Sequence, residues 1–276
     1  MGLTDVPCRR IIEICLETES ISCLIDYLQS HSTPHAGTAP AKVKQDVIKA
    51  LRRLPADARH PLVWALCQNA DPGAQEIGAL CITDFYTQYP EEVNDLLCKL
   101  ADSAHWEVRE WVASACGQLL EAHFEDYRLV MSEWARDDSD NIRRAVVLAV
   151  MYAARAKQAD RAEPLLDLLV PLLSDRSAYV MDNLGPFALG SALIKYYPAT
   201  VLERMRAWVQ SDDEQVRWNV AMAFTAAAAV VMTDEAIPIW QALARDPHPY
   251  VQKAWKKAMR NIEKRTCVQF SGEGML

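Results

Sequence analysis

The chain has little glycine and no long hydrophobic run. Only 9 of its 276 residues are glycine, whereas 51% are hydrophobic, with alanine and leucine frequent, and this composition favours helix over strand. No apolar run reaches the roughly 18–20 residues that cross a bilayer. The first residues also lack the basic and then apolar pattern of a signal peptide. We therefore expect a helical protein of the cytoplasm that has no membrane partner.

Closely spaced metal ligands and the common catalytic motifs are also missing. The eight cysteines form no CxxC pair, so we expect reduced thiols within helices rather than disulfides or a zinc site. The chain contains no P-loop, no GxGxxG, no HExxH and no GxSxG, the motifs of several nucleotide-binding and hydrolytic enzyme classes. The sequence therefore predicts no cofactor and no metal ion.

Positive charge is scarce overall, but it is unevenly spread. The formal net charge is −8. Taken over the whole chain, this negative charge disfavours binding to nucleic acid. Residues 71–138 hold 15 acidic and 4 basic residues, whereas the chain from Ser139 onward holds 15 acidic and 17 basic residues. Because local patches steer a polyanion more than the total does, a basic surface in the second half stays compatible with DNA.

What the chain does have is a repeat. An apolar helix, an Asp- and Ser-rich turn, an apolar marker and an Ala-rich helix recur with a period of 34 to 38 residues. The markers are Ala74, Val108, Ile142, Val180, Val216 and Val251, and a weaker copy has Val43. This period predicts an all-α, HEAT-like helical-repeat solenoid, or α-α superhelix, in which Asp and Ser cap the second helix of each pair.

The same pattern predicts the domain organisation. We expect an N-terminal helical cap over residues 1–30 and a loop over residues 31–41. The repeat array should occupy residues 42–265, and a flexible tail should occupy residues 266–276.

Equivalent positions of successive repeats should stack into rows. The residues after the markers are Gln75, Arg109, Arg143, Met181, Arg217 and Gln252, and the next row is Glu76, Glu110, Arg144, Asp182, Trp218 and Lys253. In HEAT-like arrays the second helix lines the concave face, so these rows are candidates for a binding surface. In the structural alternative, the acids favour the helix dipole and the arginines pair with neighbouring repeats.

Three stretches resemble the bacterial DNA alkylation repair proteins built of HEAT-like repeats, the AlkD-type DNA glycosylases. They are HWEVREW, DNIRRAVV and SAYVMDNLGPFALGSALIKYYP, and the likeness covers about half the chain. The resemblance places Trp106 on a family tryptophan and Glu110 on the catalytic aspartate. It also places Arg143 and Arg144 on arginines that contact DNA.

One position departs from this family. A second family tryptophan falls at or beside Pro186, next to Phe187, and Phe187 or Trp218 would have to supply the missing aromatic surface. Gly185 and Pro186 should also kink or end their helix.

The resemblance implies a monofunctional glycosylase that removes N3- or N7-alkylated purines from double-stranded DNA. Its setting would be the bacterial cytosol or nucleoid, and we expect a monomer. The alkylated base is already cationic, and its loss builds positive charge on the sugar. A carboxylate such as Glu110 and an aromatic face such as Trp106 both stabilise that charge. These two residues are therefore the predicted catalytic pair.

The remaining candidates are predicted to contact DNA. They are Arg109, Arg143, Arg144, Asp182, Phe187, Arg217, Trp218, Lys253, Lys256 and Lys257. The basic last helix that carries the three lysines suits phosphate contact, and it equally suits a soluble capping helix. The alternative function is a non-catalytic HEAT-repeat scaffold that binds a protein partner, which the net charge of −8 and the acidic middle of the chain favour.

Overall fold

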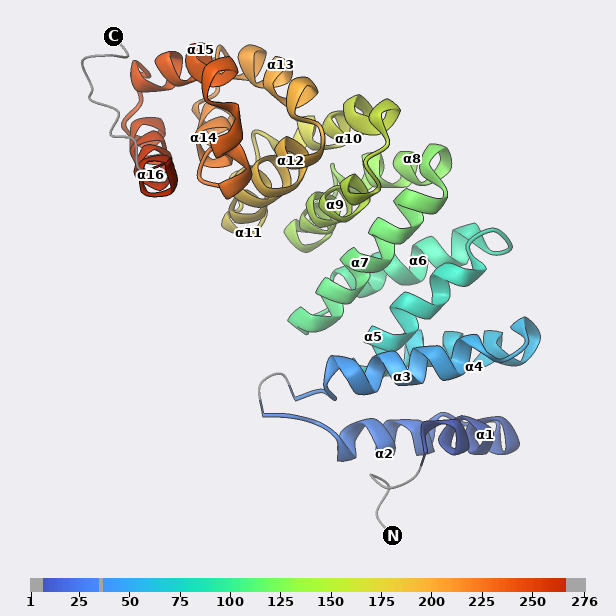
Figure 1. Cartoon of the computed structure of the whole chain (residues 1–276). Coiled ribbons are helices and arrows are strands. Elements are labelled where there is room, and N and C mark those ends of the chain that lie inside the picture. Colours follow the sequence, from blue (N-terminus) through green and yellow to red (C-terminus); the bar gives the residue numbers. More distant parts are fainter. Residues whose placement is uncertain (1–6, 35–36, 267–276) are drawn as a thin grey trace. The chain divides into compact units, whose positions relative to one another are not determined.

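The computed structural model describes residues 7–34 and 37–266 and is built of helices, with no strand among these residues (Figure 1). The predicted all-α, HEAT-like repeat fold is confirmed. No helix of the described part is long and apolar enough to cross a membrane. The predicted tail, apart from Thr266 at the end of the last helix, lies outside the described residues.

The described residues group into two compact units, one up to Leu119 and one from Leu120. The first holds α1 (Cys8–Thr18), α2 (Ser22–Ser30), α3 (Ala41–Arg52), α4 (Ala56–Gln68), α5 (Pro72–Cys81), η2 (Ile82–Phe85), α6 (Pro90–Ala101) and most of α7 (Trp106–Ala122). The second holds α8 (Phe124–Trp134), α9 (Asp140–Ala153), η3 (Ala154–Ala156), η4 (Ala159–Arg161), α10 (Ala162–Leu169), η5 (Val170–Leu172), α11 (Ala178–Asn183), η6 (Leu184–Leu193), α12 (Ile194–Tyr196), α13 (Pro198–Trp208), α14 (Glu214–Ala223), η7 (Ala227–Met232), α15 (Thr233–Ala244) and α16 (Pro249–Thr266).

Every repeat marker occupies the same place in its helix, namely the third residue. The markers and their helices are Val43 in α3, Ala74 in α5, Val108 in α7, Ile142 in α9, Val180 in α11, Val216 in α14 and Val251 in α16. Apart from Val43, these side chains are at most 7% exposed. Burial of an apolar residue at one fixed position sets the rotation of each helix, so the predicted register is confirmed.

A hydrogen-bonded turn precedes the second helices. Five residues before the marker, a short polar side chain accepts a hydrogen bond from the backbone N–H two residues on. These acceptors are Asn69, Ser103, Asp137, Asp175, Ser211 and Asp246. Such turns satisfy backbone donors ahead of the helix. The predicted capping is direct at Asp71 and Asp213, whose carboxylates accept from N–H groups of the first helical turn.

The side chain after the marker closes this turn. In five repeats it donates to the backbone carbonyl six residues earlier, and the donors are Gln75, Arg109, Arg143, Arg217 and Gln252. Arg143 also reaches the next repeat, where its Nε lies 2.6 Å from Asp175 Oδ2. Arg217 does the same with Asp246, again at 2.6 Å. Met181 occupies the equivalent position without a donor, so that repeat lacks this side-chain closure.

The helix after Val180 changes type where glycine and proline interrupt it. The sequence predicted that Gly185 and Pro186 would kink or end this helix; α11 ends at Asn183, and the chain continues as η6, a π-helix. A Cβ atom on Gly190 would lie 2.4 Å from the carbonyl oxygen of Ala223, and one on Gly185 would lie 2.9 Å from the Cβ of Met222. The two glycines therefore let η6 approach α14 more closely than any other residue would.

Candidate functional site

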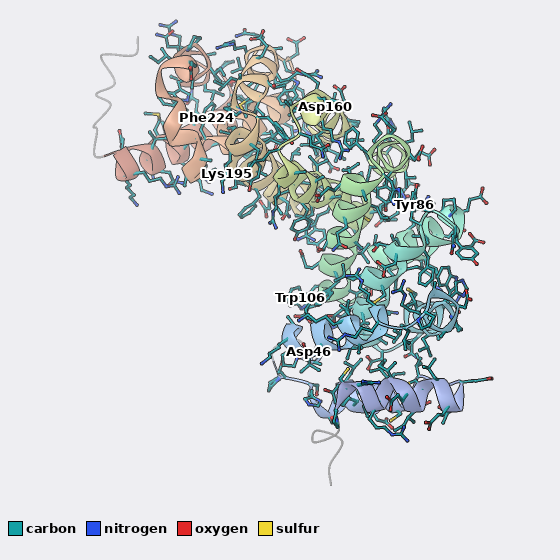
Figure 2. All side chains as sticks on the ribbon, turned by 45° about the vertical axis from the view of Figure 1, so that its right-hand side comes forward. Asp46, Tyr86, Trp106, Asp160, Lys195 and Phe224 are labelled. Carbon is teal, nitrogen blue, oxygen red and sulfur yellow. The ribbon has the colours of Figure 1, made fainter. Side chains whose placement is uncertain are left out.

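The predicted catalytic pair lies at the start of α7. Trp106 is the first residue of this helix (Figure 2), and Glu110 is the fifth. Residues four apart on a helix share a face, so the predicted spacing places Trp106 and Glu110 on one face of α7. The Trp106 side chain is 46% exposed, and Glu110 is half-buried. A large aromatic surface is thus presented beside a carboxylate.

A buried charged network lies against this first turn. The ammonium of Lys44 on α3 bonds to the carboxylate of Glu76 on α5, and their side chains are 2% and 0% exposed. Lys44 Nζ also donates to Glu107 Oε2 on α7 at 3.2 Å. The hydroxyl of Thr38 donates to the same oxygen at 2.6 Å. Lys44 lies 5.1 Å from the ring centroid of Trp111, which adds a cation–π contact.

The pKa values of the two carboxylates in this network are shifted in opposite directions. Burial raises the pKa of Glu76 above its ordinary value of 4.5, although Lys44 opposes the rise. Burial also acts to raise the pKa of Glu107, but the hydrogen bonds from Thr38 and Lys44 outweigh it and the pKa is lowered. Glu107 therefore loses its proton more readily than Glu76 does, and both carboxylates contact Lys44.

The network fixes the turn that carries the predicted catalytic pair. Glu107 and Trp111 face Lys44, while Trp106 and Glu110 occupy the adjoining face of the same helix. Breaking a buried ion pair leaves an uncompensated charge, which typically costs several kcal/mol. Lys44 thus holds α7 to α3 and α5, and Glu107 is held in a structural role beside Glu110.

The predicted DNA-contacting arginines are engaged inside the protein. Arg143 and Arg217 close their own turns and pair with the next repeat, and Arg109 closes its own turn. Arg144 is 8% exposed, and its guanidinium carbon lies 4.4 Å from the ring centroid of Tyr179. These contacts give all four arginines a structural role, and their contact with DNA stays a prediction.

Five other predicted residues come together in the second unit. Asp182, Trp218, Lys253, Lys256 and Lys257 line one cavity of about 670 Å³ against α14 and α16. The other lining residues are Met222, Pro249, Tyr250, Gln252, Ala254 and Arg260. This cavity therefore combines aromatic rings, cations and one carboxylate. Phe187 is not among its lining residues and projects from η6 with 51% of its surface exposed.

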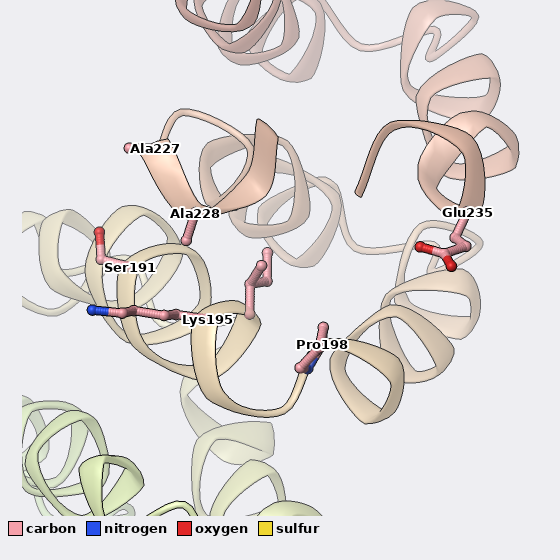
Figure 3. Close-up of a pocket in the computed structure, with 7 residues that line it drawn as sticks. Ser191, Lys195, Pro198, Ala227, Ala228 and Glu235 are labelled. Carbon is pink, nitrogen blue, oxygen red and sulfur yellow. The ribbon is translucent and has the colours of Figure 1, made fainter. Parts of the chain in front are cut away.

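A cavity of similar size has a different character. It measures about 660 Å³ and carries Lys195 and Glu235 on separate elements (Figure 3). Its other lining residues are Ser191, Ile194, Pro198, Ala227 and Ala228. None of these side chains is aromatic, so this cavity offers no stacking surface. Within residues 7–34 and 37–266, no group of His, Cys, Asp and Glu is placed to hold a metal ion.

Sequence reasoning missed several residues whose signal was present in the register. Lys44 follows the marker Val43, the same position that Arg143 and Arg217 occupy, and like them it reaches the next repeat. Glu107, Tyr179 and Tyr250 each directly precede a marker. Both tyrosines contact the second residue after the previous marker, which is Arg144 or Trp218. A third row, one residue before the markers, would have found these partners.

Comparisons with known proteins support the family and the fold. A family model described as DNA alkylation repair enzyme matches residues 34–196, which include Trp106, Glu110, Arg143 and Arg144. No curated protein matches. The karyopherin Kap121p, solved with the extreme C-terminus of the protein phosphatase Cdc14p, aligns with 94% of this chain and 30% of its own at 11% identity and a TM-score of 0.53.

Other solved helical-repeat structures align over most of the chain with lower scores. An engineered protein is 16% identical over 93% of this chain and 68% of its own, with a TM-score of 0.43. A computationally designed armadillo repeat protein is 16% identical over 92% of this chain and 99% of its own, with a TM-score of 0.36. At such identities, the karyopherin likeness concerns the fold alone.

Proposed function

The chain belongs to the DNA alkylation repair enzyme family, and on that premise we propose that it is a monofunctional DNA glycosylase. It would hydrolyse the N-glycosidic bond of N3- or N7-alkylated purines in double-stranded DNA. The observation that carries the proposal is the exposed Trp106 on one helical face with Glu110, in a turn that a buried network anchors.

The chemistry needs only a carboxylate, an aromatic face and water. The bond between the sugar C1′ and the purine nitrogen breaks, and its electron pair returns to the cationic base, which leaves neutral. Positive charge then develops on the sugar, where the Glu110 carboxylate and the Trp106 indole stabilise it. Water adds its oxygen to C1′ and gives a proton to Glu110.

Base release from methylated duplex DNA tests this proposal. Glu110→Gln keeps the size of the side chain and removes its charge, so we expect the single-turnover rate to fall about 100-fold or more, with DNA affinity unchanged. The matched control is Glu121→Gln, which makes the same charge change near the end of α7. A Glu110→Gln protein as active as wild type, or a wild type that releases no base, would overturn the proposal.

The aromatic partner has a smaller predicted effect. Trp106→Ala removes a cation–π contribution of about 0.5–2 kcal/mol, so we expect base release to slow by roughly 3- to 30-fold. Because Trp106 is nearly half exposed, the thermal stability should change little. Circular dichroism on the same sample separates a loss of chemistry from a loss of fold.

The alternative is a non-catalytic scaffold, and one observation favours it. The guanidinium groups of Arg143 and Arg217 are committed to Asp175 and Asp246, which reduces the positive charge available to phosphates. A scaffold would bind its partner equally well as wild type and as Glu110→Gln, and it would release no base.

A further inference from the structure

The cavity between α14 and α16 has the features of a nucleotide site. It measures about 670 Å³, within the range of small-molecule sites in proteins. One wall is aromatic, another is basic, and Asp182 supplies a carboxylate. All of its lining residues belong to the second unit.

The aromatic wall consists of two stacked rings. The rings of Trp218 and Tyr250 lie parallel, with 4° between their planes and 5.4 Å between their centroids. Trp218 is 8% exposed and is held by α14, while Tyr250 is half-buried at the start of α16. Each ring restricts the other, so little entropy remains to be lost when a flat ligand stacks on the accessible ring.

The basic wall comes from one face of α16. Lys256 and Lys257 follow Lys253 by three and four residues, and Arg260 follows them by four and three, which places all four on one side of a helix. All four side chains are exposed, and none has an ion-pair partner among the residues that the structure describes. Four cations against the single carboxylate of Asp182 leave the cavity positive, in a chain of net charge −8.

The carboxylate of Asp182 makes the cavity more suitable for a nucleotide than for a bare phosphate. Asp182 is exposed and would repel a phosphate placed beside it, but it accepts hydrogen bonds from N–H groups. Nucleobases carry such donors on their edges, and in a duplex those of the Watson–Crick edge are already paired. A base that is free of its complement offers the aromatic face, the N–H donors and the adjacent phosphates together.

We propose that this cavity binds one unstacked nucleotide of a single-stranded nucleic acid. The base lies against Tyr250 and Trp218 and donates to Asp182, and the flanking phosphates contact the cations of α16. The proposal goes beyond base release at Glu110 and does not depend on it.

Fluorescence anisotropy with a labelled 12-nucleotide single strand tests the aromatic wall. A stacked base contributes enough affinity that Tyr250→Leu should weaken binding about 5- to 100-fold. DNA and RNA strands serve as two sources of the same chemistry, and dependence on Tyr250 with either strand supports the site. Quenching of tryptophan fluorescence by the strand, absent in Trp218→Phe, gives a second readout if Tyr250→Leu fails to fold.

The charged wall has a matched control on the same helix. Lys257→Gln should weaken binding several-fold and reduce its salt dependence, whereas Lys264→Gln, exposed on α16 but outside the cavity, should not. Asp182→Asn should tighten binding of an abasic strand while it loosens binding of the intact strand.

Two outcomes would overturn the proposal. One is equal affinity for intact single strand, abasic strand and duplex, which would mean that the cavity recognises phosphate alone. The other is unchanged binding by Tyr250→Leu together with unchanged quenching in Trp218→Phe. Base release is scored separately on the same wild-type protein, so failure of the glycosylase proposal and failure of this site are distinguished.

Discussion

Arg217 illustrates how one side chain serves two repeats. Its guanidinium donates to the carbonyl of Ser211 in its own turn and to the carboxylate of Asp246 in the next repeat. Asp246 is only 4% exposed, so a lost partner leaves a buried carboxylate without its countercharge. These contacts of Arg217 therefore stabilise the fold, independently of any ligand.

This dual role predicts that loss of the Arg217 guanidinium lowers the free energy of unfolding, whereas loss of a surface guanidinium changes it little. Arg217→Met should lower the free energy of unfolding by about 1–3 kcal/mol, because a buried acceptor is left without its charged donor. Arg176→Met is the control, since Arg176 pairs with Asp213 and Glu214 at an exposed site where ion pairs contribute little. Urea unfolding compares the two, and equal stabilities would contradict this role of Arg217.

Glu76 makes stability depend on pH. Its pKa in the folded protein is above the ordinary 4.5. At pH values between 4.5 and that raised pKa, the folded state therefore binds more protons than the unfolded state. Stability therefore falls as pH rises through that window. The lowered pKa of Glu107 acts below 4.5, where stability falls as pH falls.

Glu76→Gln should remove the first of these two trends. We expect the melting temperature of the wild type to decline relative to that of Glu76→Gln as pH rises from about 4.5 towards neutrality. Melting curves of both proteins in a series of buffers measure the difference. Parallel pH profiles would show that Glu76 ionises as readily in the folded protein as in the unfolded chain.

At the scale of the helix, the apolar markers, together with the Asp- and Ser-rich turns before them, were enough to predict the register. Each Asn, Asp or Ser five residues before a marker closes the same turn, so a local pattern has a local structural cause. The π-helix was not predictable in this way. Gly185 and Pro186 indicated an interruption, but the continuation as η6 depends on contact with α14, which is distant in sequence.

That contact makes a prediction about η6. Gly190→Ala would place a methyl group 2.4 Å from the carbonyl oxygen of Ala223, and forced overpacking of this kind costs about 1–3 kcal/mol. Lys195→Ala, at an exposed position just after η6, is the control. Thermal unfolding followed by circular dichroism checks the difference, and equal melting temperatures would mean that η6 and α14 move apart at no cost.

At the scale of the whole molecule, some charged groups could be placed from the sequence and others could not. The basic character of α16 is visible in the sequence, and Lys253, Lys256 and Lys257 do line a cavity. The position of Lys44 after a marker was visible, but its pairing with Glu76 was not, because that pairing depends on the burial of two side chains from different repeats. The internal use of Arg143 and Arg217 was weighed as an alternative, and both guanidinium groups do pair with an aspartate of the next repeat at 2.6 Å, while their contact with DNA stays a prediction.

This distribution of charge predicts a shallow salt dependence for duplex DNA. With the arginines engaged internally, phosphate contacts should come mainly from Lys253, Lys256 and Lys257. Each contact contributes about −0.9 to the slope of log affinity against log salt, so we expect a slope of about −3. Titrations between about 50 and 200 mM salt measure it. A slope near −8 would show that the arginines exchange their internal partners for phosphates.

The closure of each turn by a side chain of its own repeat has a consequence for protein engineering. Some helix pairs carry glutamine directly after the marker, as at Gln75 and Gln252. In these pairs, the turn before the second helix is closed by a hydrogen bond within the same pair. The arginines at Arg143 and Arg217 also bond to an aspartate of the following pair. Glutamine-type pairs should therefore be the modules that tolerate transplantation or duplication, whereas the pairs of Arg143 and Arg217 should be moved together with the pair that follows them.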